Sequence, residues 1–224
     1  MITNFIDPIY KKQKINKMEL FKYKNYEDYK KYQIEANIRK INNSYVDSNS
    51  LCSLLNYLIE DLSIKPKLIL CHGTRRGLEQ QYIIDFLKLL GHTPKVIGTE
   101  ISHTALDYPN TIQWDFHETK PEWINNTDII YSNSFDHSCN PQECLDIWMS
   151  CLNKEGVCVL EYSPDCDNKK SASDPFAATL DEYKDFIKVK YEIIEILINE
   201  GIEDKGLTHN GIRYFIIIKN KDNE

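Results

Sequence analysis

The sequence of 224 residues contains no CxxC pair, no long apolar run and no excess of positive charge. Its seven cysteines are an odd number and lie mostly in apolar runs, so we expect a reduced, cytoplasmic chain. No stretch approaches the roughly 18 apolar residues that a membrane span needs, and no signal-peptide pattern opens the sequence. A net charge of -7 disfavours nucleic acids and anionic membranes, because binding phosphates depends on Lys and Arg. We therefore expect a small-molecule partner, with no nucleic acid and no membrane.

Residues 1–64 are predicted to form a helical extension. Apolar and tyrosine positions at helical spacing predict a helix over 18–41, and the leucines of 50–62 predict a second one. An amphipathic, tyrosine-rich extension suits either a lid over an acceptor pocket or a homodimer contact, and the sequence leaves both open.

Residues 65–224 are predicted to form one α/β domain. Short apolar runs alternate with helical periodicity, which is typical of βα units and a mostly parallel sheet. The linker 199–211 is too short and glycine-rich for a helical crossover, so the last two strands should be antiparallel. The predicted strands are 67–71, 95–101, 111–116, 128–131, 156–162, 191–198 and 212–218, and the predicted helices are 78–90, 141–152 and 180–188. The expected fold is therefore a Rossmann-like, seven-stranded, mostly parallel sheet with an antiparallel C-terminal hairpin.

Polar residues follow the first two of these strands. The turn His72-Gly73-Thr74-Arg75 leads into a helix, and such a turn brings backbone close to a ligand, although many turns of this kind only pack. Glu100 ends the next strand, where a carboxylate can accept from both hydroxyls of a ribose. A solvated loop glutamate is the alternative reading.

The third and fourth strands also end in polar residues. Asp115 can accept from an exocyclic amine and Phe116 can cover a ring face, so the pair suits adenine. Alternatively, Asp115 only caps the following turn. The fourth strand leads into a polar loop containing Ser134 and His137, ahead of Pro141, which opens a helix.

In this order, the segments resemble those of class I S-adenosylmethionine-dependent methyltransferases over roughly residues 65–164. More narrowly, they are similar to a branch associated with surface-polysaccharide clusters. The resemblance implies that S-adenosylmethionine is the cofactor, with Glu100 at the ribose and Ser134 below the methionine end. It also implies contacts from the first turn and the adenine side, namely His72, Gly73, Thr74, Arg75, Ile101, Asp115 and Phe116.

The first motif departs from the family pattern. Ile69 or Leu70 stands where the family has an acidic residue, and Arg75 replaces a glycine. Arg75 or Arg76 can compensate by pairing with the cofactor's carboxylate. The departure also leaves open a catalytically silent domain that pairs with a partner. A nicotinamide-dependent oxidoreductase is a further alternative, although a spaced GxGxxG is missing.

Methyl transfer to a hydroxyl needs an aligned acceptor and one base. His137, beside Asp136 in the loop after the fourth strand, is the predicted base, and His117 is the second choice. His137 can equally bond local backbone at the entry of the next helix. Together with Glu118, these residues have the chemistry of metal ligands, but their spacing matches no metal signature and none is predicted. The expected acceptor is a small hydroxyl-bearing molecule, such as a sugar or a phosphate-linked group of an envelope polysaccharide.

Overall fold

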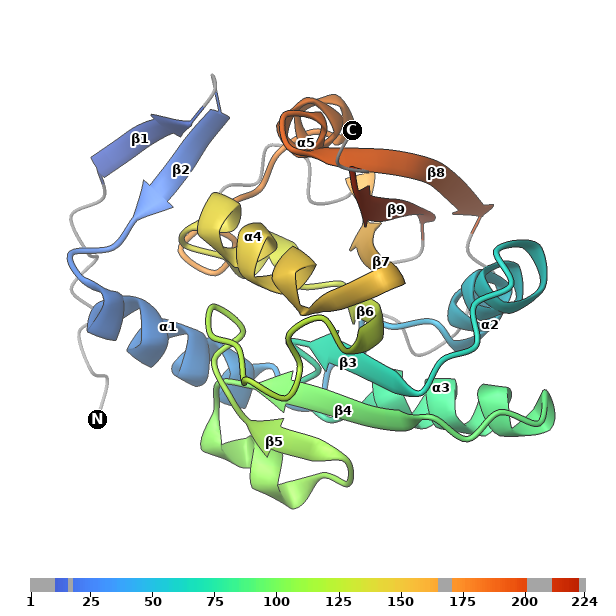
Figure 1. Cartoon of the computed structure of the whole chain (residues 1–224). Coiled ribbons are helices and arrows are strands. Elements are labelled where there is room, and N and C mark those ends of the chain that lie inside the picture. Colours follow the sequence, from blue (N-terminus) through green and yellow to red (C-terminus); the bar gives the residue numbers. More distant parts are fainter. Residues whose placement is uncertain (1–10, 16–17, 165–170, 201–210, 222–224) are drawn as a thin grey trace.

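The computed structural model describes residues 11–15, 18–164, 171–200 and 211–221 (Figure 1). Its main sheet comprises β3 Leu68–His72, β4 Lys95–Glu100, β5 Thr111–Gln113, β6 Thr127–Ser132, β7 Leu152–Tyr162, β8 Tyr191–Glu200 and β9 Ile212–Asn220. The strand order is β5-β4-β3-β6-β7-β9-β8. The strands from β3 to β7 pair in parallel, and β9 is antiparallel to both β7 and β8. The predicted fold class is confirmed.

The strand order reverses at β3, which lies between β4 and β6. The chain steps outward from β3 to β4 and β5 on one side, and to β6 and β7 on the other. In open α/β sheets, a crevice forms at the carboxyl ends of the strands at such a switch point. The loops after β3, β4 and β6 therefore converge on one place.

Helices cover both faces of the sheet (Figure 1). Because side chains of a strand alternate, Leu70 of β3 points into one core cluster while Ile69 and Cys71 point into the other. The first cluster contains residues of α4 (Pro141–Cys151) and α5 (Leu180–Lys188), and the second contains residues of α2 (Ser48–Asn56) and α3 (Leu78–Leu89). Shorter helical turns are η1 Tyr57–Asp61, η2 His103–Asp107 and η3 Phe135–His137.

The N-terminal region differs from its prediction. Residues Met18–Lys22 form β2, which pairs antiparallel with β1 (Lys11–Ile15), so the predicted helix was wrong there. The helix α1 spans Tyr26–Arg39 instead, and the side chain of Asn25 caps it by accepting from the Asp28 N–H at 2.8 Å. Leu20 is buried in the main core, which ties the hairpin to the sheet domain.

The third predicted strand ends earlier than expected. β5 stops at Gln113, because Asp115 Oδ1 accepts from the His117 N–H at 3.1 Å and turns the chain. Asp115 and Phe116 consequently lie in the loop beyond the strand.

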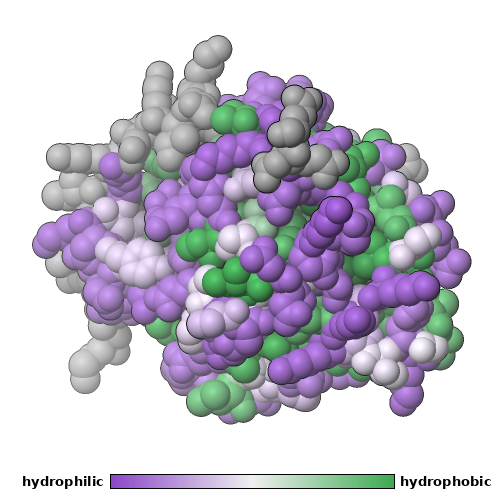
Figure 2. All heavy atoms as spheres, viewed as in Figure 1, coloured by the Kyte–Doolittle hydropathy of each residue, from purple (hydrophilic) through white to green (hydrophobic). Residues whose placement is uncertain are grey.

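Within the described residues, no helix is long and apolar enough to cross a membrane. The face shown in Figure 2 is largely hydrophilic, with apolar residues interspersed among polar ones.

Candidate active site

The turn after β3 packs tightly against the loop after β6. Gly73 has a φ of +75°, and a Cβ at this position would lie 2.7 Å from Ser134 Cβ. Both the backbone conformation and the space therefore require glycine. Two serine hydroxyls of the second loop clamp the turn, since Ser132 donates to the carbonyl of His72 at 2.9 Å and Ser134 to that of Gly73 at 3.2 Å.

The same turn is tied to the end of β4. The N–H groups of Gly73 and Thr74 both donate to the carbonyl of Thr99, at 2.9 and 3.1 Å, and the N–H of Arg75 donates to Glu100 Oε2 at 3.1 Å. The turn is thus fixed from both neighbouring strands.

His72 lies beneath this turn rather than in a cavity. Its ring stacks on Trp148 with centroids 4.6 Å apart, and its Nδ1 is 2.9 Å from Thr99 Oγ1. Burial lowers the pKa of His72 to about 3, so the ring is neutral. The structure therefore places His72, predicted among the cofactor contacts, in a supporting position that lines neither cavity described below.

Two adjacent cavities open at the switch point, with volumes of about 230 Å³ and about 50 Å³. They share a wall made by Lys40, Gly73, Arg75, Ser134 and His137. The predicted site residues that line at least one cavity are Gly73, Thr74, Arg75, Glu100, Ile101, Asp115, Phe116, Ser134, Asp136 and His137.

The smaller cavity gathers the predicted adenosine contacts. Glu100, Ile101, Asp115 and Phe116 form one side, and α1 closes the other with Tyr29, Gln33, Ala36 and Asn37. Burial raises the pKa of Glu100, although N–H donors from Ser102 and Arg75 oppose this by stabilising the carboxylate. About 50 Å³ has room for a few water molecules only.

Asp115 is fully engaged in this state. Its Oδ2 accepts from the Tyr26 hydroxyl at 2.7 Å, and its Oδ1 lies 3.0 Å from His117 Nδ1. Burial would raise the pKa of Asp115, but these hydrogen bonds outweigh it and lower the pKa. His117 is itself buried, lies 2.9 Å from Ser138 Oγ through Nε2 and lines neither cavity. His117, the second-choice base, therefore contacts Asp115 and Ser138, and its role in catalysis stays a prediction.

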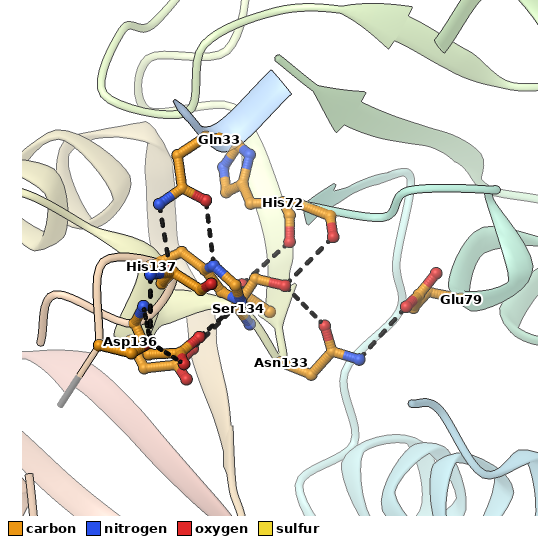
Figure 3. Close-up of polar contacts among 12 residues, drawn as sticks. Gln33, His72, Glu79, Asn133, Ser134, Asp136 and His137 are labelled. Carbon is orange, nitrogen blue, oxygen red and sulfur yellow. Dashed lines mark hydrogen bonds and ion pairs between the residues drawn. The ribbon is translucent and has the colours of Figure 1, made fainter. Parts of the chain in front are cut away.

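The larger cavity holds an acid–base cluster around His137 (Figure 3). Its Nδ1 lies 3.2 Å from Gln33 Oε1, while Gln33 Nε2 donates to the carbonyl of Ser173 at 3.1 Å. This orientation of the amide places an acceptor against Nδ1, which can donate a hydrogen bond to it. Nε2 lies 3.9 Å from Asp136 Oδ1 and 3.7 Å from Asp174 Oδ1.

Asp174 was missed by the sequence reasoning, because it lies in a loop without a motif. One of its oxygens accepts from Ser171 Oγ at 2.7 Å and the other faces His137. Ligand atoms of Asp136, His137 and Asp174 lie within 4.8 Å of one another, so the described residues do contain one group with cation-ligand chemistry. This group does not include His117 or Glu118, which the sequence had also offered as possible ligands. The expectation that the protein binds no metal stays a prediction.

The larger cavity is lined by further charged residues. Glu161 pairs with Arg213 at 2.5 Å and accepts a hydrogen bond from Tyr131. Three more charged residues line the same cavity, namely Arg75, Arg76 and Glu79. The buried Nε atoms of both arginines and the buried Oε2 atom of Glu79 have no hydrogen-bond partner in the protein. Such atoms are costly unless a ligand satisfies them.

No family model matches the sequence, and no curated protein does. Solved structures are similar to it. The Burkholderia thailandensis 1,6-didemethyltoxoflavin-N1-methyltransferase, crystallised with S-adenosylhomocysteine, gives a TM-score of 0.63 at 12% identity over 95% of this chain and 100% of that one. The chain has the class I methyltransferase fold.

Two further structures agree with this fold, and both were also solved with S-adenosylhomocysteine. The plantazolicin methyltransferase BpumL gives a TM-score of 0.61 at 17% identity, covering 88% of this chain and 93% of its own. The N-methyltransferase NodS from Bradyrhizobium japonicum gives 0.60 at 11% identity, covering 85% and 99%.

Proposed function

We propose that this protein is an S-adenosylmethionine-dependent methyltransferase that acts on a hydroxyl of a small polar acceptor. One observation carries the proposal: Gly73, Glu100, Asp115 and Phe116 converge on one crevice at the switch point of a class I methyltransferase fold. Similar structures with that fold hold S-adenosylhomocysteine, which supports the same cofactor here.

The residues present fit this cofactor. Glu100 would accept from the ribose hydroxyls, Ile101 and Phe116 would cover the adenine, and Asp115 would accept from its amine once released by Tyr26. The unpartnered buried atoms of Arg75, Arg76 and Glu79 provide charge for a zwitterionic end. Bound in this crevice, S-adenosylmethionine would supply an electrophilic methyl group.

His137 is the proposed general base. Its Nε2 would accept the proton that the acceptor hydroxyl loses, while the cofactor would supply the methyl group and leave as S-adenosylhomocysteine. Asp136 and Asp174, 3.9 and 3.7 Å from Nε2, stabilise the imidazolium that results, and Gln33 holds the ring through Nδ1. Displacement at a methyl carbon depends mainly on alignment of the two reactants, and the walls of the cavity would provide that alignment.

The larger cavity suits a sugar-type acceptor. Three aromatic residues line it, namely Tyr45, Tyr162 and Tyr183, and the carboxylates of Asp136 and Asp174 can accept from hydroxyl groups. Lys40 provides a positive charge that would favour a phosphate-linked group. These features support an acceptor of the kind found in envelope polysaccharides.

Calorimetric titration with S-adenosylmethionine, S-adenosylhomocysteine and NADH tests the cofactor. We expect both sulfur compounds to bind and Glu100→Ala to weaken them, with no binding of NADH. Binding of NADH alone would favour the oxidoreductase, and binding of none would favour a silent partner domain.

The acceptor is tested by transfer of a radiolabelled methyl group to matched sugars that differ only in a hydroxyl or an amine, such as glucose and glucosamine. Two of the similar structures are N-methyltransferases by name, so the amine is the relevant control. We expect transfer to the hydroxyl, and loss of about 100-fold or more in His137→Ala. Full turnover in that variant would contradict the assignment of the base.

A further inference from the structure

The turn after β3 has little backbone left for a ligand. Four of its N–H groups are donated within the protein: Gly73 and Thr74 to Thr99, Arg75 to Glu100, and Gly77 to Thr74. These groups cannot hold the amino-acid end of a nucleoside cofactor without breaking existing hydrogen bonds. We therefore expect side chains to supply most of the contacts to that end.

Glu79, in the first turn of α3, has the properties of a ligand contact (Figure 3). Its side chain lines the larger cavity, although the residue is only 6% exposed. Oε1 accepts from Asn133 Nδ2 at 3.2 Å, whereas Oε2 is buried without any hydrogen-bond partner. A buried carboxylate oxygen left unpartnered costs stability, so it marks a place where a donor from a ligand is expected.

Two arginines, Arg75 and Arg76, precede Glu79 by four and three positions in the sequence. Arg76 and Arg75 line the same cavity, and the Nε atom of each is buried without a partner. The Arg75 guanidinium already stacks on Tyr45 at 4.7 Å and donates to the carbonyl of Asn43, which leaves Arg76 as the less engaged of the two. The cavity thus offers an acceptor for a cation beside donors for an anion.

We propose that Glu79 binds the α-ammonium group and Arg76, assisted by Arg75, the α-carboxylate of the cofactor's amino-acid end. The inference rests on the proposed function and deepens it. The charge that is missing from the strand at Ile69 and Leu70 is supplied by the helix that follows. Glu100, which lines the smaller cavity only, remains the proposed contact for the ribose.

The test compares two ligands that differ only at the amino-acid end: S-adenosylhomocysteine, and 5′-methylthioadenosine, which lacks the ammonium and carboxylate groups. Titration calorimetry would use wild type, Glu79→Gln, Arg76→Gln and Glu100→Gln. Asp85→Asn, an exposed position on the same helix, is the matched control. Thermal melting establishes that each variant is folded.

We expect Glu79→Gln and Arg76→Gln each to weaken S-adenosylhomocysteine by about 10- to 100-fold, the range of one charged hydrogen bond, and to leave methylthioadenosine within about twofold. Glu100→Gln should weaken both ligands, and Asp85→Asn neither. Equal weakening of both ligands in Glu79→Gln and Arg76→Gln, or no weakening, would overturn the inference. If wild type binds neither ligand, the proposed function itself fails.

Discussion

Removing the Tyr26 hydroxyl should increase the affinity for S-adenosylhomocysteine. The cavity beside Glu100 is about 50 Å³ and α1 lines one side of it, so we expect a nucleoside to enter only after α1 shifts. The hydrogen bond from Tyr26 to Asp115, at 2.7 Å, is one of the contacts that must break. Burial and the nearby Asp115 carboxylate raise the pKa of Tyr26, so the hydroxyl stays protonated and donates.

The size of the effect follows from this single contact. A hydrogen bond to a charged group contributes about 1.5–3 kcal/mol, and the 39% exposure of Tyr26 places it at or below the lower limit. Losing about 1.4 kcal/mol from the closed state alone would raise the apparent affinity about tenfold in Tyr26→Phe. The other contacts of α1, including those of the buried residues Tyr29 and Gln33, are unchanged in this variant. They limit how far the affinity can rise.

Titration calorimetry with S-adenosylhomocysteine measures this gain. Tyr32→Phe is the matched control, because Tyr32 is also on α1 and its ring contacts, with Tyr23 and Arg39, survive the change. An unchanged or lower affinity in Tyr26→Phe would show that α1 keeps its position when ligand binds. It would then contradict the interpretation of α1 as a lid.

Three further outcomes are expected. Burial raises the pKa of Glu79 to about 7, against the opposing effect of Arg75 and with a contribution from Glu161. The proposed binding of the ammonium group needs the ionised carboxylate of Glu79. The affinity for S-adenosylhomocysteine should therefore fall from pH 8 to pH 6, while the affinity for methylthioadenosine stays constant. The same pH dependence for both ligands would contradict this. Arg213→Met leaves Glu161 buried without its counter-charge and should lower the free energy of unfolding by about 3–5 kcal/mol in urea titrations; a loss below about 1 kcal/mol would refute it. The proposed role of His137 as a base needs no metal, so EDTA should leave methyl transfer unchanged. Loss of activity in EDTA and its restoration by Mg²⁺ would instead identify the cluster with Asp136 and Asp174 as a metal site.

The sheet was predictable because its signals are local. Each buried strand is a short apolar run, and the glycine-rich link before β9 excludes a helical crossover. Strand ends then follow by topology: the carboxyl ends of parallel neighbours meet, which brings Glu100 and Asp115 to one cavity. The N-terminal hairpin was not predictable in this way. The spacing of Leu20 and Tyr23 matches one face of a helix, although Leu20 belongs to the strand β2 and is buried in the core.

Side-chain directions at the turns needed the structure. His72 and His117 sit next to predicted strands, and the sequence cannot tell whether such residues face a crevice or the packing beneath it. The cluster around His137 is assembled from three distant segments, since Gln33 comes from α1 and Asp174 from the loop after β7. No spacing rule connects these positions.

In the proposed site, Glu79 of α3 takes the place of the acidic residue that the methyltransferase pattern has in the first strand. A glutamate in the first turn of a helix normally reads as a solvated residue that favours the helix dipole. Here Asn133, from the loop after β6, donates to one oxygen of its carboxylate, and the second oxygen is buried without a hydrogen-bond partner in a residue that lines the cavity. The strand β3 contains no acidic residue, and the negative charge of the proposed site comes from the helix that follows. Burial without a partner is the physical signal that identifies it.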